Sequence, residues 1–179
     1  PGSCTNTNPV VLNLKVFIEG FYSAVNTMRA PLGGSNCDTI EVRLATSASP
    51  YTIMYTVKGI INTSGNGVFT FPGSALGNSY YIIVKHRNSL ETWSGSAIPF
   101  PSTSNSFDFT TLVTQAFGGI QVQVSTGKWA IRSGDVNQDG AINTSDYSFL
   151  QTTLSSFVVG YQVKDITGDN CLESTDYSL

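Results

Sequence analysis

A twelve-residue pattern rich in oxygen-bearing side chains occurs twice near the C-terminus, and the second copy starts 30 residues after the first. Calcium takes oxygen ligands, and a loop that wraps around the ion presents them at positions 1, 3, 5, 7, 9 and 12. In the first copy these positions hold Asp135, Asn137, Asp139, Ala141 (through its carbonyl), Asn143 and Asp146. In the second copy they hold Asp165, Thr167, Asp169, Cys171 (through its carbonyl), Glu173 and Asp176. The pattern predicts two Ca²⁺ sites, so this part of the chain is expected to fold as two tight loops.

The sixth position of each loop supports this interpretation, because the backbone turns sharply there with a positive φ. Gly140 and Asn170 occupy it, and these residue types tolerate the left-handed region best. The alternative is a surface turn rich in Asx residues that binds nothing. Two copies in register favour the metal sites. Because Thr167 is a weak ligand, the second loop is expected to bind calcium less tightly than the first.

The distribution of charge agrees with the loops. Residues 135–179 contain seven acidic residues and one base and carry a net charge of −6, whereas residues 1–134 carry +3. Carboxylates held a few ångströms apart repel one another by about 1 kcal/mol or more per pair unless a cation lies between them. We therefore expect residues 134–179 to be loose or unfolded without calcium.

The run from Asp135 to Leu150, with its second copy, resembles the duplicated motif of dockerin domains. The resemblance covers residues 134–179 and implies a small α-helical domain in which each calcium loop leads into a helix. It implies binding to a cohesin-like or other cell-surface protein, so that the domain anchors a larger secreted protein. The first helix is expected to span residues 144–154, and the second has only begun where the sequence stops.

Hydroxyl residues follow the ninth ligand position in both loops. In the best-known dockerins, residues at loop positions 10 and 11 contact the cohesin, and the resemblance therefore implies partner contacts through Thr144, Ser145, Ser174 and Thr175. The structural alternative is that the same residues cap the helix that starts there, with Asp146 or Asp176 in its first turn.

The preceding part of the chain, residues 8–132, has the period-two alternation of β-strands. Turn residues separate short apolar segments, and Ser64–Gly67 is typical of a hairpin connection. This predicts a mainly β fold, an immunoglobulin-like or transthyretin-like β-sandwich, ahead of the dockerin-like domain. The expected strands are residues 10–18, 39–44, 51–57, 68–71, 80–84, 107–109, 120–124 and 128–132.

The segments Leu12–Tyr22, Met28–Ala30, Gly77–Asn88 and Glu91–Trp93 carry a second resemblance. They are similar to a recurrent C-terminal module of secreted and surface proteins of Bacteroidetes-type bacteria. This implies a secreted, cell-surface location, and it implies no catalytic residue. Only Ser133 and Gly134 separate the two parts of the chain, so we expect the sandwich to dock against the calcium loops and stiffen them.

Other functional classes find little support in the sequence. His86 is the single histidine and is expected to be packed, and the carboxylates of residues 1–134 follow no catalytic spacing. The chain is therefore predicted not to be an enzyme, and no basic face or apolar run predicts nucleic-acid binding or membrane insertion. Three cysteines allow at most one internal bridge; Cys4 and Cys37 are the pair to consider, and Cys171 is expected to be unpaired.

Two functions remain alternatives to calcium-dependent anchoring. The first is a carbohydrate-binding module with structural calcium, in which exposed aromatic residues such as Tyr51, Tyr55 or Trp93 stack on sugar rings. The second is a passive spacer within a larger protein.

Overall fold

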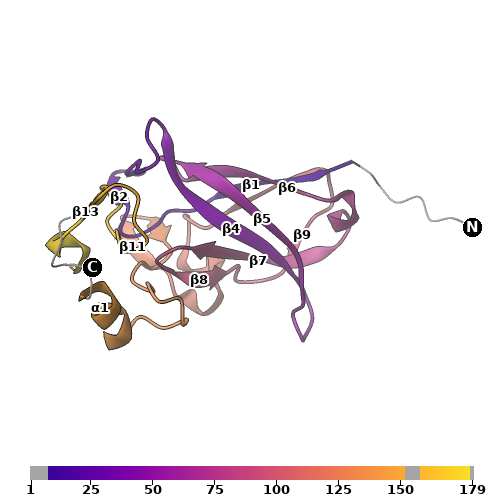
Figure 1. Ribbon diagram of the computed structural model, residues 1–179. Coiled ribbons are helices and arrows are strands. Elements are labelled where there is room, and N and C mark those ends of the chain that lie inside the picture. Colours follow the sequence, from indigo (N-terminus) through magenta and orange to yellow (C-terminus); the bar gives the residue numbers. More distant parts are fainter. Residues whose placement is uncertain (1–7, 152–157, 178–179) are drawn as a thin grey trace, which may run out of the picture.

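The computed structural model describes residues 8–151 and 158–177 and has a mainly β fold with several sheets, as expected (Figure 1). Its strands are β1 (Val10–Lys15), β2 (Tyr22–Ala24), β3 (Thr27–Met28), β4 (Asn36–Thr46), β5 (Ile53–Asn62), β6 (Asn66–Phe71), β7 (Ser79–His86), β8 (Ser89–Trp93), β9 (Ile98–Pro99), β10 (Ser104–Asp108), β11 (Val122–Ser125), β12 (Lys128–Ala130), β13 (Val158–Val159) and β14 (Cys171–Leu172). Its helical elements are α1 (Thr144–Gln151) and the short 3₁₀ turns η1 (Gly73–Ala75), η2 (Val113–Gln115), η3 (Phe117–Gly119) and η4 (Ser174–Tyr177).

Two sheets organise residues 8–132, which we call the β-rich segment. The larger has the order β5-β4-β7-β8, with β9 also pairing with β7, and the smaller has the order β10-β1-β6. β1 runs antiparallel to β6 and parallel to β10. β4 and β7 are the two central strands of this sheet, and Val42 lies opposite Val84. The apolar residues on both faces of β7 are typical of a central strand, whereas β4 alternates apolar and charged residues.

Side chains from both sheets meet in one hydrophobic core. β1 and β6 contribute Leu12 and Phe69, and the larger sheet contributes Leu44 and Ile82, all of them fully buried. Burying one such side chain stabilises the fold by about 1.5–3 kcal/mol. The core also includes Ala130 and Ile131, which lie just before the C-terminal residues.

Two sequence expectations are wrong in this segment. The strand expected over residues 10–18 ends at Lys15, and Val16, Phe17 and Ile18 are all buried without alternating. The expected hairpin at Ser64–Gly67 joins different sheets, because β5 belongs to the larger sheet and β6 pairs with β1. Gly65 passes so close to the residues after β1 that a Cβ there would lie 2.5 Å from the carbonyl oxygen of Val16. The turn is therefore held by contacts across the two sheets.

The acidic part, residues 134–177, which we call the C-terminal segment, packs at one end of the β-rich segment (Figure 1). α1 begins at Thr144 as expected and is described as far as Gln151; the rest of the expected helix lies outside the described residues. The first turn of the expected second helix is the 3₁₀ turn η4. β13, which precedes the second loop, pairs with β14 inside that loop, and the sequence did not predict this two-stranded sheet.

Candidate functional site

The first loop is closed by side chains that accept hydrogen bonds from its own backbone. Asp146, at position 12, accepts from the N–H groups of Val136 (2.8 Å) and Asn137 (3.2 Å) through Oδ1. Asp135, at position 1, accepts from Asp139 and Gly140 through its two carboxylate oxygens. Position 12 is thereby joined to the start of the loop, although ten residues separate them.

The second loop repeats these bonds at the equivalent positions. Asp176 Oδ1 accepts from Ile166 (2.9 Å) and Thr167 (3.0 Å). Asp165 accepts from Asp169 through Oδ1 and from Asn170 through Oδ2. Equivalent residues of the two loops therefore play the same conformational roles, and the repeat found in the sequence is also a repeat of backbone structure.

The sixth position has the predicted left-handed conformation in both loops. Gly140 has φ +87° and Asn170 has φ +65°. Asn170 also donates from Nδ2 to the carbonyl oxygen of Pro31 (3.0 Å), which ties the turn of the second loop to the β-rich segment. An asparagine at this position therefore contributes a contact that glycine could not make.

The predicted ligands of the two loops differ in exposure. Asp135, Asp146, Asp165, Thr167 and Asp176 are buried. The other predicted ligand positions, Asn137, Asp139, Ala141, Asn143, Asp169, Cys171 and Glu173, are exposed or half-buried. In each loop the two end carboxylates are thus buried beneath a more open rim.

The donor set of the first loop is that of a hard cation, because it contains only carboxylate, amide and carbonyl oxygens. Within residues 8–151 and 158–177, however, no group of three or more His, Cys, Asp or Glu side chains is placed to hold a metal ion. The carboxylates of Asp135 and Asp146 are instead engaged by backbone N–H groups. Each of these carboxylates keeps further lone pairs, so ion binding requires the ligands to converge on a common centre but not the loss of these bonds.

Burial raises the pKa of the first ligand in each loop. It raises the pKa of Asp135, against the N–H of Gly140, and the charge of Asp146 raises it further. Burial also raises the pKa of Asp165, but the positive charge of Arg87 opposes the rise. The first ligand of the second loop therefore has a neighbouring cation, Arg87, that acts on its pKa, whereas Asp135 has none within the described residues.

The predicted partner-binding residues Thr144, Ser145, Ser174 and Thr175 are all exposed. The alternative role for the first pair, capping of α1, belongs to a different residue. Asn143 Oδ1 accepts from the N–H of Ser145 (2.7 Å), and Asp146 Oδ2 accepts from the N–H of Asn143 (3.0 Å), which together form a capping box. The side chains of Thr144 and Ser145 are therefore not needed for the cap.

The two loops pack against each other through equivalent residues. Val136 and Ile166 are buried in one small apolar cluster with Leu150 of α1. The rings of Tyr147 and Tyr177, which occupy the same place in the two copies, meet edge to face with centroids 5.3 Å apart. The described part of the second helix is thus joined to the first.

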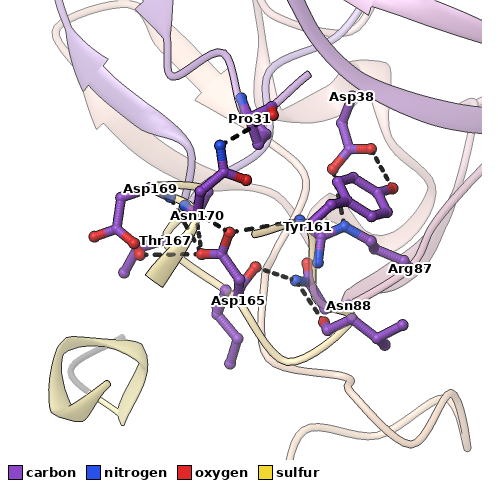
Figure 2. A network of polar contacts seen from close by, with 12 residues as sticks. Pro31, Asp38, Arg87, Asn88, Tyr161, Asp165, Thr167, Asp169 and Asn170 are labelled. Carbon is purple, nitrogen blue, oxygen red and sulfur yellow. Dashed lines mark hydrogen bonds and ion pairs between the residues drawn. The ribbon is translucent and has the colours of Figure 1, made fainter. Parts of the chain in front are cut away.

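A buried polar cluster connects the second loop to the β-rich segment, and the sequence did not predict it (Figure 2). Asn88 is fully buried and donates from Nδ2 to the carbonyl oxygens of Asp165 (2.8 Å) and Val163 (3.1 Å). Arg29 donates to the carbonyl oxygen of Thr167 (2.8 Å). The second loop is therefore fixed by side chains from two separate turns of the β-rich segment.

Asp38 lies at the centre of the same cluster. Tyr161 donates to it (2.6 Å), Arg87 Nε donates to it (2.9 Å), and His86 Nε2 lies 3.2 Å away. Although burial opposes ionisation, His86, Arg87 and Tyr161 lower the pKa of Asp38 to about 2. Burial lowers the pKa of His86, so the imidazole is neutral at pH 7 and Arg87 balances the charge of Asp38. The packed histidine expected from the sequence is part of a structural network.

Aromatic residues form a separate surface pocket on the larger sheet. Tyr51, Tyr81, Trp93 and Phe117 line this pocket, whose volume is about 330 Å³. Tyr51 is 45% exposed and adopts a positive φ of 56°, which is rare for a bulky residue and strains the backbone. Tyr55, which the sequence grouped with Trp93, packs instead on Tyr80.

The cysteines of the described residues are free thiols. Cys37 is buried and Cys171 is half-buried, and Cys4 lies outside the described residues. Within those residues, no helix combines the length and the apolar character needed to cross a bilayer.

Comparison with known proteins does not identify the chain. No protein-family model matches it, and a search of curated proteins finds no significant match.

Proposed function

We propose that this chain is a non-catalytic, calcium-dependent interaction or anchoring module of a larger secreted or cell-surface bacterial protein. In this proposal residues 134–179 are a dockerin-like domain, and residues 8–132 are a β-sandwich that supports it. One observation carries the proposal: two acidic loops, 30 residues apart in sequence, share one pattern of carboxylate-to-backbone hydrogen bonds. Such a pattern shapes a loop around a point to which oxygen ligands can converge.

In this proposal Asp135, Asn137, Asp139 and Asp146 would hold the first ion, together with the carbonyl of Ala141. A bound Ca²⁺ would supply the positive charge that offsets the mutual repulsion of these carboxylates. The exposed Thr144 and Ser145, and Ser174 and Thr175 of the second copy, would then face a cohesin-like partner. Neither the ion nor the partner needs a catalytic group in this chain.

Calorimetry tests the metal sites. Ca²⁺ is expected to bind and Mg²⁺ to bind more weakly, because flexible oxygen-rich loops suit the larger ion. At a free calcium concentration 100-fold above Kd, binding stabilises the folded state by about 2.7 kcal/mol, so chelator should lower the melting temperature. Melting that is identical in calcium and in chelator contradicts the proposal.

Pull-down from the envelope of the producing cell, in calcium and in chelator, tests the partner. The expected result is a calcium-dependent surface protein whose capture is lost when Thr144 and Ser145 are both replaced by arginine. Replacing the exposed Thr56 and Thr70 of the β-rich segment in the same way is the matched control, because these residues lie far from the loops in the sequence.

The aromatic pocket favours a second candidate function, binding of a neutral glycan. The ring of Trp93 meets Tyr81 at 5.9 Å and Tyr51 at 6.4 Å between centroids, which makes a broad apolar surface on which a pyranose ring could stack. The adjacent charges of Glu91 and Lys85 pair with each other (3.4 Å), so the surroundings favour a hydroxyl-rich ligand over an ion. On a glycan array, Trp93→Ala should abolish binding while Tyr55→Ala preserves it; absence of any glycan ligand excludes this function.

A further inference from the structure

Arg87 is the cation that lies beside the Asp165 carboxylate of the second loop, and the β-rich segment holds it firmly. Its side chain is only 10% exposed and follows β7 directly. Nε donates to Asp38, and the guanidinium lies over the rings of Tyr161 (4.4 Å) and Phe21 (5.4 Å). Cation-π contacts on this scale orient a guanidinium and strengthen when they are desolvated.

The free end of this guanidinium faces the first ligand position of the second loop (Figure 2). Arg87 Nη2 lies 3.9 Å from Asp165 Oδ2, and Asp165 is fully buried. Both terminal nitrogens of Arg87 are buried and have no hydrogen-bond partner within the described residues. A buried carboxylate is costly without compensation. The N–H groups of Gly168 and Asn170 donate to Asp165, and Arg87 adds an opposite charge beside it.

The first loop has no such neighbour. Asp135 is equally buried, but within residues 8–151 and 158–177 no lysine or arginine forms an ion pair with Asp135, Asp139 or Asp146. The bonds from position 12 to the start of the loop are the same in both loops. The second loop adds bonds from the Thr167 hydroxyl and the Gly168 N–H, so the loops differ in some internal bonds as well as in their source of positive charge.

We propose that Arg87 supplies to the second loop the positive charge that the first loop takes from a divalent ion. The second loop then stays closed on the β-rich segment without calcium, fixed also by Asn88 and Arg29, and the first loop is the calcium-responsive one. The part of this inference that concerns calcium rests on the function proposed above. The part that concerns Arg87 does not, because it is a statement about the calcium-free protein.

Hydrogen exchange in excess chelator tests the inference on the whole chain. The amides of Ile166, Thr167 and Gly168 should be protected in the wild type, because they donate to Asp176 and Asp165 inside a closed loop. In Arg87→Gln their protection factors should fall about ten- to hundredfold, the equivalent of losing one buried charge-assisted interaction. Lys58→Gln removes the same charge from a side chain that is 71% exposed, and it should change nothing.

A double-mutant cycle with Asp165→Asn separates charge compensation from packing. If Arg87 acts on the Asp165 carboxylate, Arg87→Gln should have at most a small further effect in the Asp165→Asn background. An equal loss of protection in both backgrounds would mean that Arg87 only packs, and it would overturn the inference. Wild-type amides at 166–168 that exchange freely in chelator would overturn it as well.

Two internal readouts keep the result interpretable. Protection of the amides of β4 and β7 reports whether Arg87→Gln unfolds the β-rich segment. If it does, the test is made with the single variant Asp165→Asn, and unchanged protection of its second-loop amides refutes the inference. Adding calcium should protect Val136 and Asn137 of the first loop. If calcium has no effect there, the proposed function fails, while the chelator result for Arg87 stands by itself.

Discussion

Replacing Asn88 with alanine should release the C-terminal segment from the β-rich segment without unfolding the latter. Asn88 Nδ2 donates to the carbonyl oxygens of Asp165 and Val163, and alanine removes both bonds. The backbone of Asn88 also accepts from the N–H of Gly134 (2.7 Å), and that bond survives the substitution. The change therefore affects two hydrogen bonds between segments that lie far apart in the sequence.

The expected magnitude follows from the burial of the two acceptors. Asp165 is fully buried, so leaving its carbonyl without a donor costs about 1–3 kcal/mol. Val163 is 49% exposed, so water can replace the lost bond there, which costs about 0.5–1.5 kcal/mol. Asn88 Oδ1 is buried and accepts no hydrogen bond from residues 8–151 or 158–177, so removing it returns part of this energy. A net loss of about 2 kcal/mol remains.

Hydrogen exchange of the amides of residues 165–170 measures this loss, which corresponds to about a 30-fold drop in protection. Asn78→Ala is the matched control, because Asn78 also donates from Nδ2 to two carbonyl oxygens, those of Ser74 and Leu76. It is exposed and lies in a different turn, so the second loop should keep its protection. Equal behaviour of the two variants would refute the assignment of Asn88 as the link between the segments.

Gly168→Ala should weaken the contact between the second loop and the β-rich segment by about 2–4 kcal/mol, because Gly168 has φ +70° and a Cβ would lie 2.8 Å from the Phe21 ring. The control is the melting temperature of Gly160→Ala, because Gly160 has φ +101° but no neighbour within 4 Å, so this variant measures the cost of backbone strain alone. Burial lowers the folded-state pKa of His86 below 6.5, so the neutral imidazole contributes its full stability above pH 6.5 and this contribution is lost as the pH falls. Urea titrations should give a lower free energy of unfolding at pH 5.5 than at pH 7.5, and His86→Gln should make this difference smaller. Asp38, with a pKa of about 2, should add a further loss only between about pH 4 and pH 2. Asp146→Asn should weaken calcium binding at the first loop by about tenfold or more in calorimetry, whereas Glu41→Gln, on the sheet surface, should leave it unchanged.

The sequence predicted those features that depend on residues close together in the chain. The period-two alternation located β4 and most other long strands, and a short apolar run located β7. The spacing of Asp, Asn and Gly predicted the turn at Gly140, where φ is positive. Local hydrogen bonds determine both kinds of feature. At the start of α1, Asn143 caps the helix, a role that the alternative interpretation had assigned to its hydroxyl neighbours.

Features that depend on distant residues were not predicted. Arg87 and Asp165 are far apart in the sequence, and no spacing rule indicates that the end of β7 faces the second loop. The pairing of β6 with β1 rather than β5 was likewise hidden, because a turn sequence fixes a change of direction but not the sheet that receives the next strand. Packing of the whole chain decides these contacts.

The position of β1 has a mechanical consequence. β1 begins at the end of the molecule remote from the C-terminal segment (Figure 1) and is bonded along its length to β6 on one side and β10 on the other. Hydrogen bonds between strands run across the strand direction. Tension applied between Val10 and the C-terminal segment would therefore slide β1 lengthwise and strain both rows of bonds at once. A chain pulled in this way resists rupture much better than one whose strands are peeled apart bond by bond.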